Sequence, residues 1–438
     1  MCGLPLRIKT PSLALEKEAI GKMDNTHRKY IFVVLILAAL AILVVTLTSQ
    51  DLQFKETVIA GSPEDFAEVR HVVLKGTNFE IGTKLAELAK RHGTQIDSSG
   101  DPFMNRVKRK YVKNSYPVMY ERMRGIAAAY GLEFNDDAYD FTALPYNLRG
   151  IPGCSVVFYP KDYSKNGHSI LSRNYDFTTG NIQGRYPEEG ELPVMSRPYL
   201  IEIYPDQGYP SLALHSFDLL SGLIDGINSE GLAVAILAES ESVSKVGREG
   251  ANEVGLAELS SMRYLLDNCK SVEEAKEAML TMKHFYSFIP CHYIIADRSG
   301  KSFIFEFSPN RNRSYIIDGK GPQCITNHLV FHHPDVGDVA DKDPGNSLRR
   351  YKTLGDATAE KKKYTLEEME AINNRVAVAA QASRHEEYAP GRTLWYAQYD
   401  CDDRTLTVRF YLGEKPDPSN ESKMICEYSK PQTFRLRY

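Results

Sequence analysis

The chain lacks the short motifs that identify the commonest enzyme classes. Its 438 residues contain no G-x-S-x-G, Walker A or G-x-G-x-x-G pattern, so neither a nucleophile elbow nor a nucleotide-binding loop is predicted. None of the seven cysteines stands in a C-x-x-C pair, which argues against a zinc site or a dithiol redox motif. Because seven is an odd number, at least one thiol is left out of any intramolecular disulfide.

An excess of positive charge is also missing. The formal net charge is −4 and the pI is about 6.3, which does not favour binding to nucleic acid. The basic run at 106–110 is local, and we interpret it as the solvated face of a helix rather than a contact with an anionic surface. His332 and His333 are adjacent but lack carboxylates at ligand spacing. The sequence therefore predicts no nucleic acid partner, no metal ion and no organic cofactor, and it indicates no oligomeric state.

One long hydrophobic run is present near the N-terminus. Residues 31–48 carry no charge and, at about 1.5 Å per residue, nearly reach the ~30 Å thickness of a hydrocarbon core. Basic residues precede the run, so the positive-inside rule predicts a polar cytoplasmic tail at 1–30, a single transmembrane anchor at 31–48 and an extracytoplasmic remainder that begins with a linker at 49–70. Secretion after signal cleavage is the alternative, and Met23 could equally be the true start.

From about residue 55 the hydrophobic pattern predicts one continuous domain. A strand and a helix are expected between 71 and 93, and mostly helix over 104–132. Short β-rich runs joined by tight turns follow, helices return at 256–282, and a hairpin at 393–412 closes the domain. Short turns imply antiparallel pairing, and antiparallel sheets with segregated helices indicate the α+β class.

Cys154 stands at the start of a predicted β-hairpin, directly after Gly153. A free thiol titrates near 8.5, so a cysteine nucleophile needs a base. The usual base is histidine, but spacing singles out none of the histidines near this region or in the later loop: His168, His328, His332 and His333.

Cleavage of the Gly153–Cys154 bond would supply the missing base. The freed α-amino group has a reference pKa of about 7.7–8.0, which suits a general base near neutral pH. One residue then provides both nucleophile and base, as in threonine N-terminal nucleophiles. Taken alone, a Gly-Cys pair is more often a structural accident.

Two charged residues end the second strand of the same hairpin. Arg173 and Asp176 are three positions apart, so they converge only if the strand bends or ends there. In that case Asp176 can hold the ammonium of Cys154, while Arg173 favours the thiolate or a polar group of the substrate. A surface ion pair is the other interpretation.

These residues, together with later motifs in the same order, resemble the cysteine N-terminal-nucleophile (Ntn) hydrolases. This superfamily includes choloylglycine hydrolases, penicillin acyltransferase, acid ceramidase and N-acylethanolamine acid amidase. The cysteine and R-N-x-D are followed by "DGINSEGLAVAILAES", "CITNH" and "NSLRRYKTL", and "LKGTNFEIGTKLAELAKRHG" is similar to the start of a penicillin-acyltransferase propeptide. The likeness covers roughly 70–412. It implies a four-layer αββα sandwich of antiparallel sheets that cuts itself into a propeptide or α fragment at 71–153 and a catalytic β fragment at 154–438.

The resemblance also implies roles for single residues. Five of them match the family's catalytic positions: Cys154, Arg173, Asp176, Asn327 and Arg350. Asn327 matches a donor to the tetrahedral oxyanion. The S-x-x-R spacing selects Arg350, rather than its neighbour Arg349, as the arginine that steadies the nucleophile.

One position departs from the choloylglycine hydrolases. A second oxyanion asparagine is expected ten residues after Asn228, and Ala238 stands there instead. This difference argues against bile-salt specificity. A backbone N–H, for instance that of Ser155, is the expected replacement.

The resemblance implies a self-activating enzyme that forms an acyl-enzyme on Cys154 and cleaves linear N-acyl amides, which are its small-molecule partners. Transfer of the acyl group to an amine acceptor is the first alternative. A membrane-anchored binding protein of the same fold without catalysis is the second. The alanine at 238 favours that second alternative, whereas the retained set of five matching residues argues against it.

Overall fold

The computed structural model describes residues 52–98, 100–142, 153–239, 253–287, 289–308, 313–333, 346–359, 362–380 and 387–437. These residues form two β-sheets and seven α-helices, with the loops that connect them. All of them belong to one compact unit that begins at Leu52.

The larger sheet has nine strands in the order β1-β2-β5-β6-β7-β8-β9-β10-β11. Its strands are β1 (Gln53–Ala60), β2 (Val69–Gly76), β5 (Tyr199–Pro205), β6 (Ser211–His215), β7 (Asp225–Asn228), β8 (Ala233–Ala238), β9 (Cys291–Ala296), β10 (Ser302–Ser308) and β11 (Arg313–Asp318). Its central strands β6 to β9 are buried throughout, as expected for strands covered on both faces.

The smaller sheet has seven strands in the order β12-β3-β4-β13-β14-β15, and β16 also pairs with β14. Its strands are β3 (Gly153–Tyr159), β4 (Ile170–Thr178), β12 (Gln323–Ile325), β13 (Gly391–Asp400), β14 (Thr405–Asp417), β15 (Asn420–Tyr428) and β16 (Gln432–Arg435). The predicted hairpin after Gly153 is present as β3 and β4, which pair in antiparallel register.

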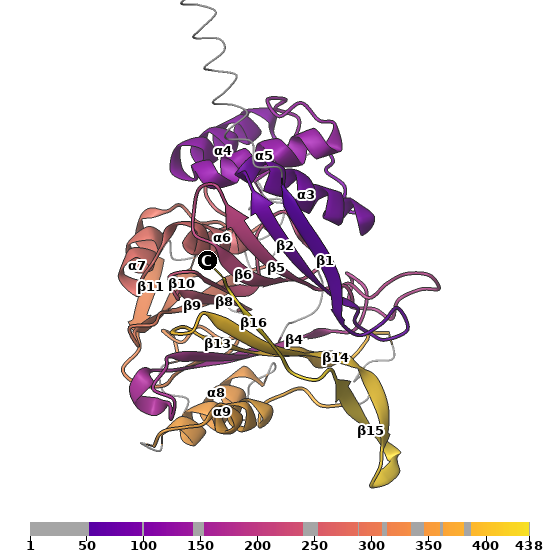
Figure 1. Cartoon of the computed structure of the whole chain (residues 1–438), viewed down its shortest axis with the longest axis vertical. Helices are drawn as coiled ribbons and strands as arrows, with labels where there is room; N and C mark the ends of the chain where they lie inside the picture. The colour runs from indigo at the N-terminus through magenta and orange to yellow at the C-terminus, as the bar shows by residue number, and fades with distance from the viewer. Residues whose placement is uncertain are drawn as a thin grey trace, which may run out of the picture. The chain divides into compact units, whose positions relative to one another are not determined.

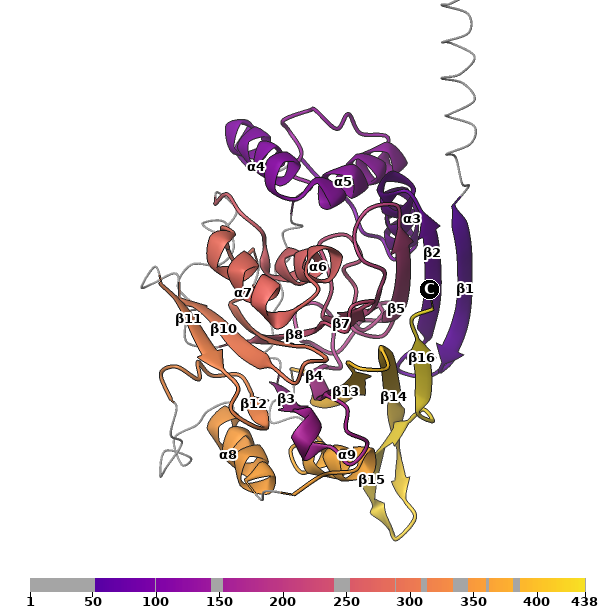
Figure 2. The ribbon, with the colours of Figure 1, turned by 60° about the vertical axis from the view of Figure 1, so that its left-hand side comes forward.

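Helices cover the outer face of each sheet, so the domain has four layers (Figure 1). The helices over the larger sheet are α3 (Asn78–Arg91), α4 (Pro102–Ser115), α5 (Pro117–Tyr130), α6 (Glu258–Asn268) and α7 (Val272–Thr281). On the other side, α8 (Ser347–Thr358) and α9 (Leu366–Asn374) lie on the smaller sheet (Figure 2). The largest hydrophobic core fills the space between the sheets. This arrangement agrees with the predicted α+β class and αββα layering.

The N-terminal helices pack closely because small residues face each other. Helix α3 begins at a capping box in which Thr77 and Glu80 satisfy each other's backbone N–H groups. Where α3 crosses α5, a Cβ added at Gly82 would lie 2.1 Å from the carbonyl oxygen of Arg122, and one at Gly125 would lie 2.0 Å from that of Phe79. Only glycine permits this approach, and of the two helices α3 lies directly against β2 and β5.

The structure does not support the transmembrane helix that was predicted as part of the fold class. No helix in the described ranges is long and apolar enough to cross a membrane. The longest have 14 residues, which is about 21 Å against the ~30 Å of a hydrocarbon core. We therefore withdraw the transmembrane helix from the fold class. The predicted anchor at 31–48 and tail at 1–30 lie outside the described residues.

The prediction of purely antiparallel sheets is wrong at one place. Strands β2 and β5 pair in parallel, with Arg70 opposite Tyr199. Parallel neighbours need a long crossover connection. The chain between Gly76 and Tyr199 supplies it, because it carries α3 to α5 and the β3–β4 hairpin.

The helical stretch predicted at 104–132 is two helices, divided before Pro117, which fits the first turn of α5. The basic run within it is solvated only in part. Lys108 is 1% exposed and pairs with Asp140 at 2.8 Å, and Arg109 is buried against Asp137. Because buried charges require partners, half of this run serves to hold the chain that follows α5.

Candidate active site

Cys154 is the second residue of β3 and faces the space between the two sheets. It stands opposite Tyr175 of β4. Cys154 lines a pocket of about 470 Å³, part of which is open to solvent, and the lining consists almost entirely of apolar side chains. The pocket residues besides Cys154 are Tyr175, Phe177, Met195, Ser216, Phe217, Ile224, Ile236, Ala238, Leu259, Ile289 and Cys291.

Arg173 reaches the thiol from the same face of the sheet. It pairs with Val156 across the hairpin, two residues beyond Cys154, and residues two apart in a strand share a face. Its Nη2 donates to Sγ of Cys154 at 3.6 Å, and its side chain is fully buried. Burial raises the pKa of the Cys154 thiol, and the guanidinium opposes that effect.

Asp176 lies on the opposite face of the hairpin, next to Gly153. The two residues are paired across the strands, and a Cβ on Gly153 would lie 3.6 Å from Oδ2 of Asp176. Thr393 donates to Oδ1 at 2.6 Å, whereas Oδ2 has no hydrogen-bond partner among the described residues. Burial raises the pKa of Asp176 to about 7, against the opposing charge of Arg350 and the hydrogen bond from Thr393.

The two charged residues therefore meet the cysteine from different sides. From the sequence we expected Arg173 and Asp176 to converge only if β4 bends or ends there. The two side chains lie on opposite faces of β4, so they do not converge on one face. A bulge in β13, between Thr393 and Trp395, does interrupt the ladder beside Asp176. It brings the Thr393 hydroxyl onto the carboxyl group.

Asn327 and Arg350 hold the backbone of the cysteine. The N–H of Cys154 donates to Oδ1 of Asn327 at 2.7 Å, and Arg350 donates to the same oxygen at 2.7 Å and to the carbonyl of Cys154 at 2.5 Å. Nδ2 of Asn327 donates to the carbonyl of Ala238 at 2.7 Å. These partners determine the orientation of the amide, since its oxygen meets two donors and its nitrogen an acceptor. Arg349, the neighbour that the spacing passed over, is exposed.

A buried network, which sequence reasoning missed, positions Asn327. Oγ of Ser347 accepts from the N–H of Asn327 at 2.7 Å, and a ring nitrogen of His292 lies 2.6 Å from the carbonyl of Thr326. His292 also pairs with Glu306 at 3.1 Å. A histidine and a glutamate inside otherwise apolar strands, in "CHYIIA" and "SFIFEFS", were the available signal.

Asp225 is a second charged residue that sequence reasoning missed. It is the first residue of β7, in "LIDGIN", and pairs with Arg173 at 2.6 Å. A carboxylate between apolar residues of a short strand was again the signal, because a buried charge needs a partner.

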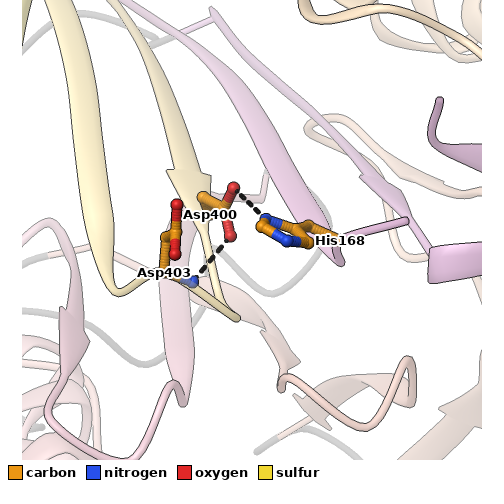
Figure 3. A group of neighbouring side chains, drawn as sticks. All are labelled: His168, Asp400 and Asp403. Atoms are coloured by element: carbon orange, nitrogen blue, oxygen red, sulfur yellow. Dashed lines mark hydrogen bonds and ion pairs between the residues drawn. The ribbon is translucent and has the colours of Figure 1, made fainter. Parts of the chain in front are cut away.

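None of the described histidines considered as a base for Cys154 contacts the thiol. His168 lies two residues before β4 begins and seven residues before Tyr175, and it pairs with Asp400 at 2.7 Å (Figure 3). At about 3.3 Å per residue, the strand separates it from Tyr175 by roughly 20 Å. His328 is buried beside Asn327, but its Nδ1 lies 2.9 Å from Oγ of Ser347.

His168, Asp400 and Asp403 bring three possible ligand atoms within 4.8 Å of one another (Figure 3). The backbone N–H of Asp403 donates to Asp400 at 2.9 Å, and Arg435 pairs with the Asp403 carboxylate at 2.9 Å. These contacts explain the cluster, and we assign no metal site to it.

This chain is similar in part to several known proteins. A penicillin V acylase from Pectobacterium atrosepticum is 28% identical over 135 residues, which cover 28% of this chain and 35% of the relative. The match thus spans about a third of that relative's length. The fold is similar to a conjugated bile acid hydrolase from Clostridium perfringens (17% identity, TM-score 0.44, 65% of this chain and 97% of that one). A penicillin V acylase from Agrobacterium tumefaciens is also similar (16% identity, TM-score 0.40, 59% and 82%).

A sequence model of the family described as acyl-coenzyme A:6-aminopenicillanic acid acyl-transferase matches residues 163–415, which is more than half of the chain. This match confirms the predicted family, whose description names an acyl-transferase. The chain belongs to the acyl-coenzyme A:6-aminopenicillanic acid acyl-transferase family.

Proposed function

We propose that this protein is a self-activating cysteine Ntn hydrolase that cleaves linear N-acyl amides through an acyl-enzyme on Cys154. The observation that carries the proposal is the surroundings of that cysteine. Its thiol opens onto an apolar pocket, while buried polar side chains contact its thiol and both of its backbone polar groups. A purely structural cysteine needs no such set.

Maturation begins with the intact Gly153–Cys154 bond. The thiol attacks the carbonyl carbon of Gly153, the C–N bond breaks, and the nitrogen of Cys154 takes the proton. Water then hydrolyses the resulting thioester, which frees the thiol and leaves a carboxylate on Gly153. Asn327 and Arg350 suit this step, because they hold the N–H and C=O groups of Cys154 while the bond is exchanged. The products are the fragment that ends at Gly153 and the fragment at 154–438.

In the mature enzyme the new α-amino group of Cys154 accepts the thiol proton as the thiolate attacks the substrate amide. Oδ1 of Asn327, which accepts from this nitrogen in the intact chain, is placed to orient the amine. The Nδ2 group has a second N–H beyond the one given to Ala238, and this N–H is our candidate oxyanion donor. The leaving amine takes a proton from the α-ammonium, and water hydrolyses the acyl-enzyme.

The pocket favours an apolar acyl group. Its lining includes aromatic and aliphatic side chains from both sheets and from α6, and no Lys, Arg, Asp or Glu among the described residues. Burying a charged acyl group there would cost several kcal/mol without a partner. We therefore infer a preference for aliphatic or aromatic acyl amides over acyl groups that carry a charge at the far end.

Acyl transfer is a second candidate, favoured by the description of the family to which the chain belongs. Hydrolysis and transfer share the acyl-enzyme and differ in what attacks it. A thioester donor offered in water with increasing concentrations of an amine separates them. Acid as the main product throughout supports hydrolysis, and amide that dominates at millimolar amine supports transfer.

Mutation of Cys154 to Ala tests the proposal most directly. Mass spectrometry of the wild-type protein should give a fragment that begins at Cys154, and the variant should remain intact and lose hydrolysis of every acyl amide tested. Cys426→Ala is a matched control, since this half-exposed thiol lies in β15 outside the pocket. A Cys154→Ala protein that still yields both fragments and full activity would rule out the mechanism.

A further inference from the structure

The Arg173–Asp225 ion pair lies directly behind the nucleophile. Nη1 of Arg173 is 2.6 Å from Oδ2 of Asp225, and both side chains are 0% exposed. The other terminal nitrogen, Nη2, donates to Sγ of Cys154 at 3.6 Å. One guanidinium is thus shared between a carboxylate and the thiol.

Both members of the pair are held from two layers of the fold. Arg173 donates to the carbonyl of Ile224, just before β7, at 3.2 Å and to that of Ile236 in β8 at 2.7 Å. Asp225 accepts a hydrogen bond from the hydroxyl of Tyr399, which belongs to the smaller sheet. The position of the guanidinium beside the thiol therefore depends on a cluster that joins the sheets.

We propose that Asp225 is a positioning residue that holds the Arg173 guanidinium on the Cys154 thiol and balances its charge. This inference rests on the proposed function, in which Cys154 is the nucleophile. Without Asp225, the guanidinium of Arg173 would be a permanent cation in an apolar space, and the Cys154 thiol would be the acidic group left in contact with it. With Asp225 the cation is already compensated, so the thiol keeps its proton until the α-amine removes it.

The sign of the effect follows from the charges around the thiol. The titratable and charged groups that face Cys154 or its arginine come from five elements: Tyr175 and Asp176 on β4, Asp225 on β7, Cys291 on β9, Tyr399 on β13 and Arg350 on α8. Burial raises the pKa of Asp225, and Arg173 opposes this by favouring the carboxylate. An asparagine at 225 keeps an oxygen that can accept from Arg173, so the guanidinium stays beside the thiol while the negative charge is lost. Loss of that anion favours the thiolate and lowers the pKa of Cys154.

Alkylation of Cys154 by iodoacetamide across a pH series tests the proposal without any substrate. Peptide mass mapping of the full chain, or of its fragments, reports this cysteine separately from the others. In Asp225→Asn the midpoint of the rate against pH should fall by about one unit, so that alkylation at pH 7 is about tenfold faster. An unchanged or higher midpoint would overturn the proposal.

Tyr399→Phe provides a milder variant if Asp225→Asn fails to fold. It keeps the carboxyl group at 225 but removes a hydrogen-bond donor that favours its ionised form, so we expect a shift in the same direction, of about threefold in rate at pH 7. No shift in a folded Tyr399→Phe protein, when Asp225→Asn cannot be made, overturns the proposal.

Asp267→Asn is the matched control. This carboxylate is also fully buried and pairs with Arg122 at 2.7 Å, but it contacts none of the five site residues. Asp267→Asn should lower the stability against urea and leave the midpoint of the Cys154 alkylation profile unchanged. A shift of the midpoint as large as that in Asp225→Asn would show that any loss of stability changes the pKa of the thiol. The Cys154→Ala result judges the proposed function separately, because the alkylation profile does not depend on turnover.

Discussion

The β3–β4 hairpin has a charged pair near each end, and the two pairs differ in their surroundings rather than in their geometry. Near the cysteine, Arg173 and Asp225 lie 2.6 Å apart and both are 0% exposed. Near the turn, His168 and Asp400 lie 2.7 Å apart, and their side chains are 32% and 14% exposed. The separation of the charges is nearly the same, so contact distance alone does not distinguish a site from a surface feature.

Burial decides what each pair can do. Water screens the charges at the turn, so that pair contributes little beyond local order. Between the sheets there is little screening, and the charge of Arg173 acts strongly on the thiol beside it. The same hairpin therefore carries the candidate site at the end that the second sheet covers.

Of the three substitutions considered next, Arg350→Gln should have the largest effect on fragment formation and on hydrolysis. It removes two charge-assisted hydrogen bonds that hold Cys154 and Asn327, each of which contributes about 1.5–3 kcal/mol. We expect the rate of fragment formation and kcat/KM to fall by about 100-fold or more, measured by gel densitometry and amide hydrolysis. Arg349→Gln, at the exposed neighbour on the same helix, should change neither; equal losses in both variants would show that α8 matters only as a helix.

Asp176→Asn tests how burial of a carboxyl group changes the dependence of stability on pH. The pKa of this buried carboxyl is about 7 in the folded chain against about 3.9 when unfolded, so between these values the folded chain binds more protons. The free energy of unfolding should therefore decrease as the pH rises from about 4 to 7, by up to roughly 4 kcal/mol from this group. Urea unfolding at several pH values should show a flatter dependence in the variant, and an identical slope in both proteins would contradict the raised pKa.

His168→Gln should have the smallest effect. The hydrogen bond with Asp400 raises the pKa of His168, so its stabilisation is complete below the unfolded pKa of about 6.5 and is lost as the pH rises through the folded value. Because the ring is about a third exposed, screening keeps the contribution below about 1 kcal/mol. We expect a slightly lower free energy of unfolding at pH 5.5, none of that loss at pH 8.5, and unchanged hydrolysis; loss of hydrolysis would place the turn in the site.

The hairpin and most neighbouring turns were predictable from sequence because alternation and turn residues are local signals. The ordered motifs likewise pointed to five residues that all contact or adjoin the Gly153–Cys154 segment, although their catalytic roles remain predictions. The parallel pairing of β2 with β5 was not predictable, since a crossover of more than a hundred residues leaves no local signal. The buried half of the basic run was missed because its partner Asp140 lies 32 positions away.

The sequence by itself determined the α+β class and the hairpin that carries Cys154, because these depend on periodicity and turn residues along the chain. The choice of Arg350 over Arg349 came from the resemblance to a known family. Only the tertiary structure decided that Arg173 and Asp176 approach from opposite faces, that Asn327 turns its oxygen to the cysteine, and that Asp225 compensates Arg173. Those outcomes depend on which strands and helices enclose a residue. Enclosure removes water, and without water each buried charge must find its partner within the fold.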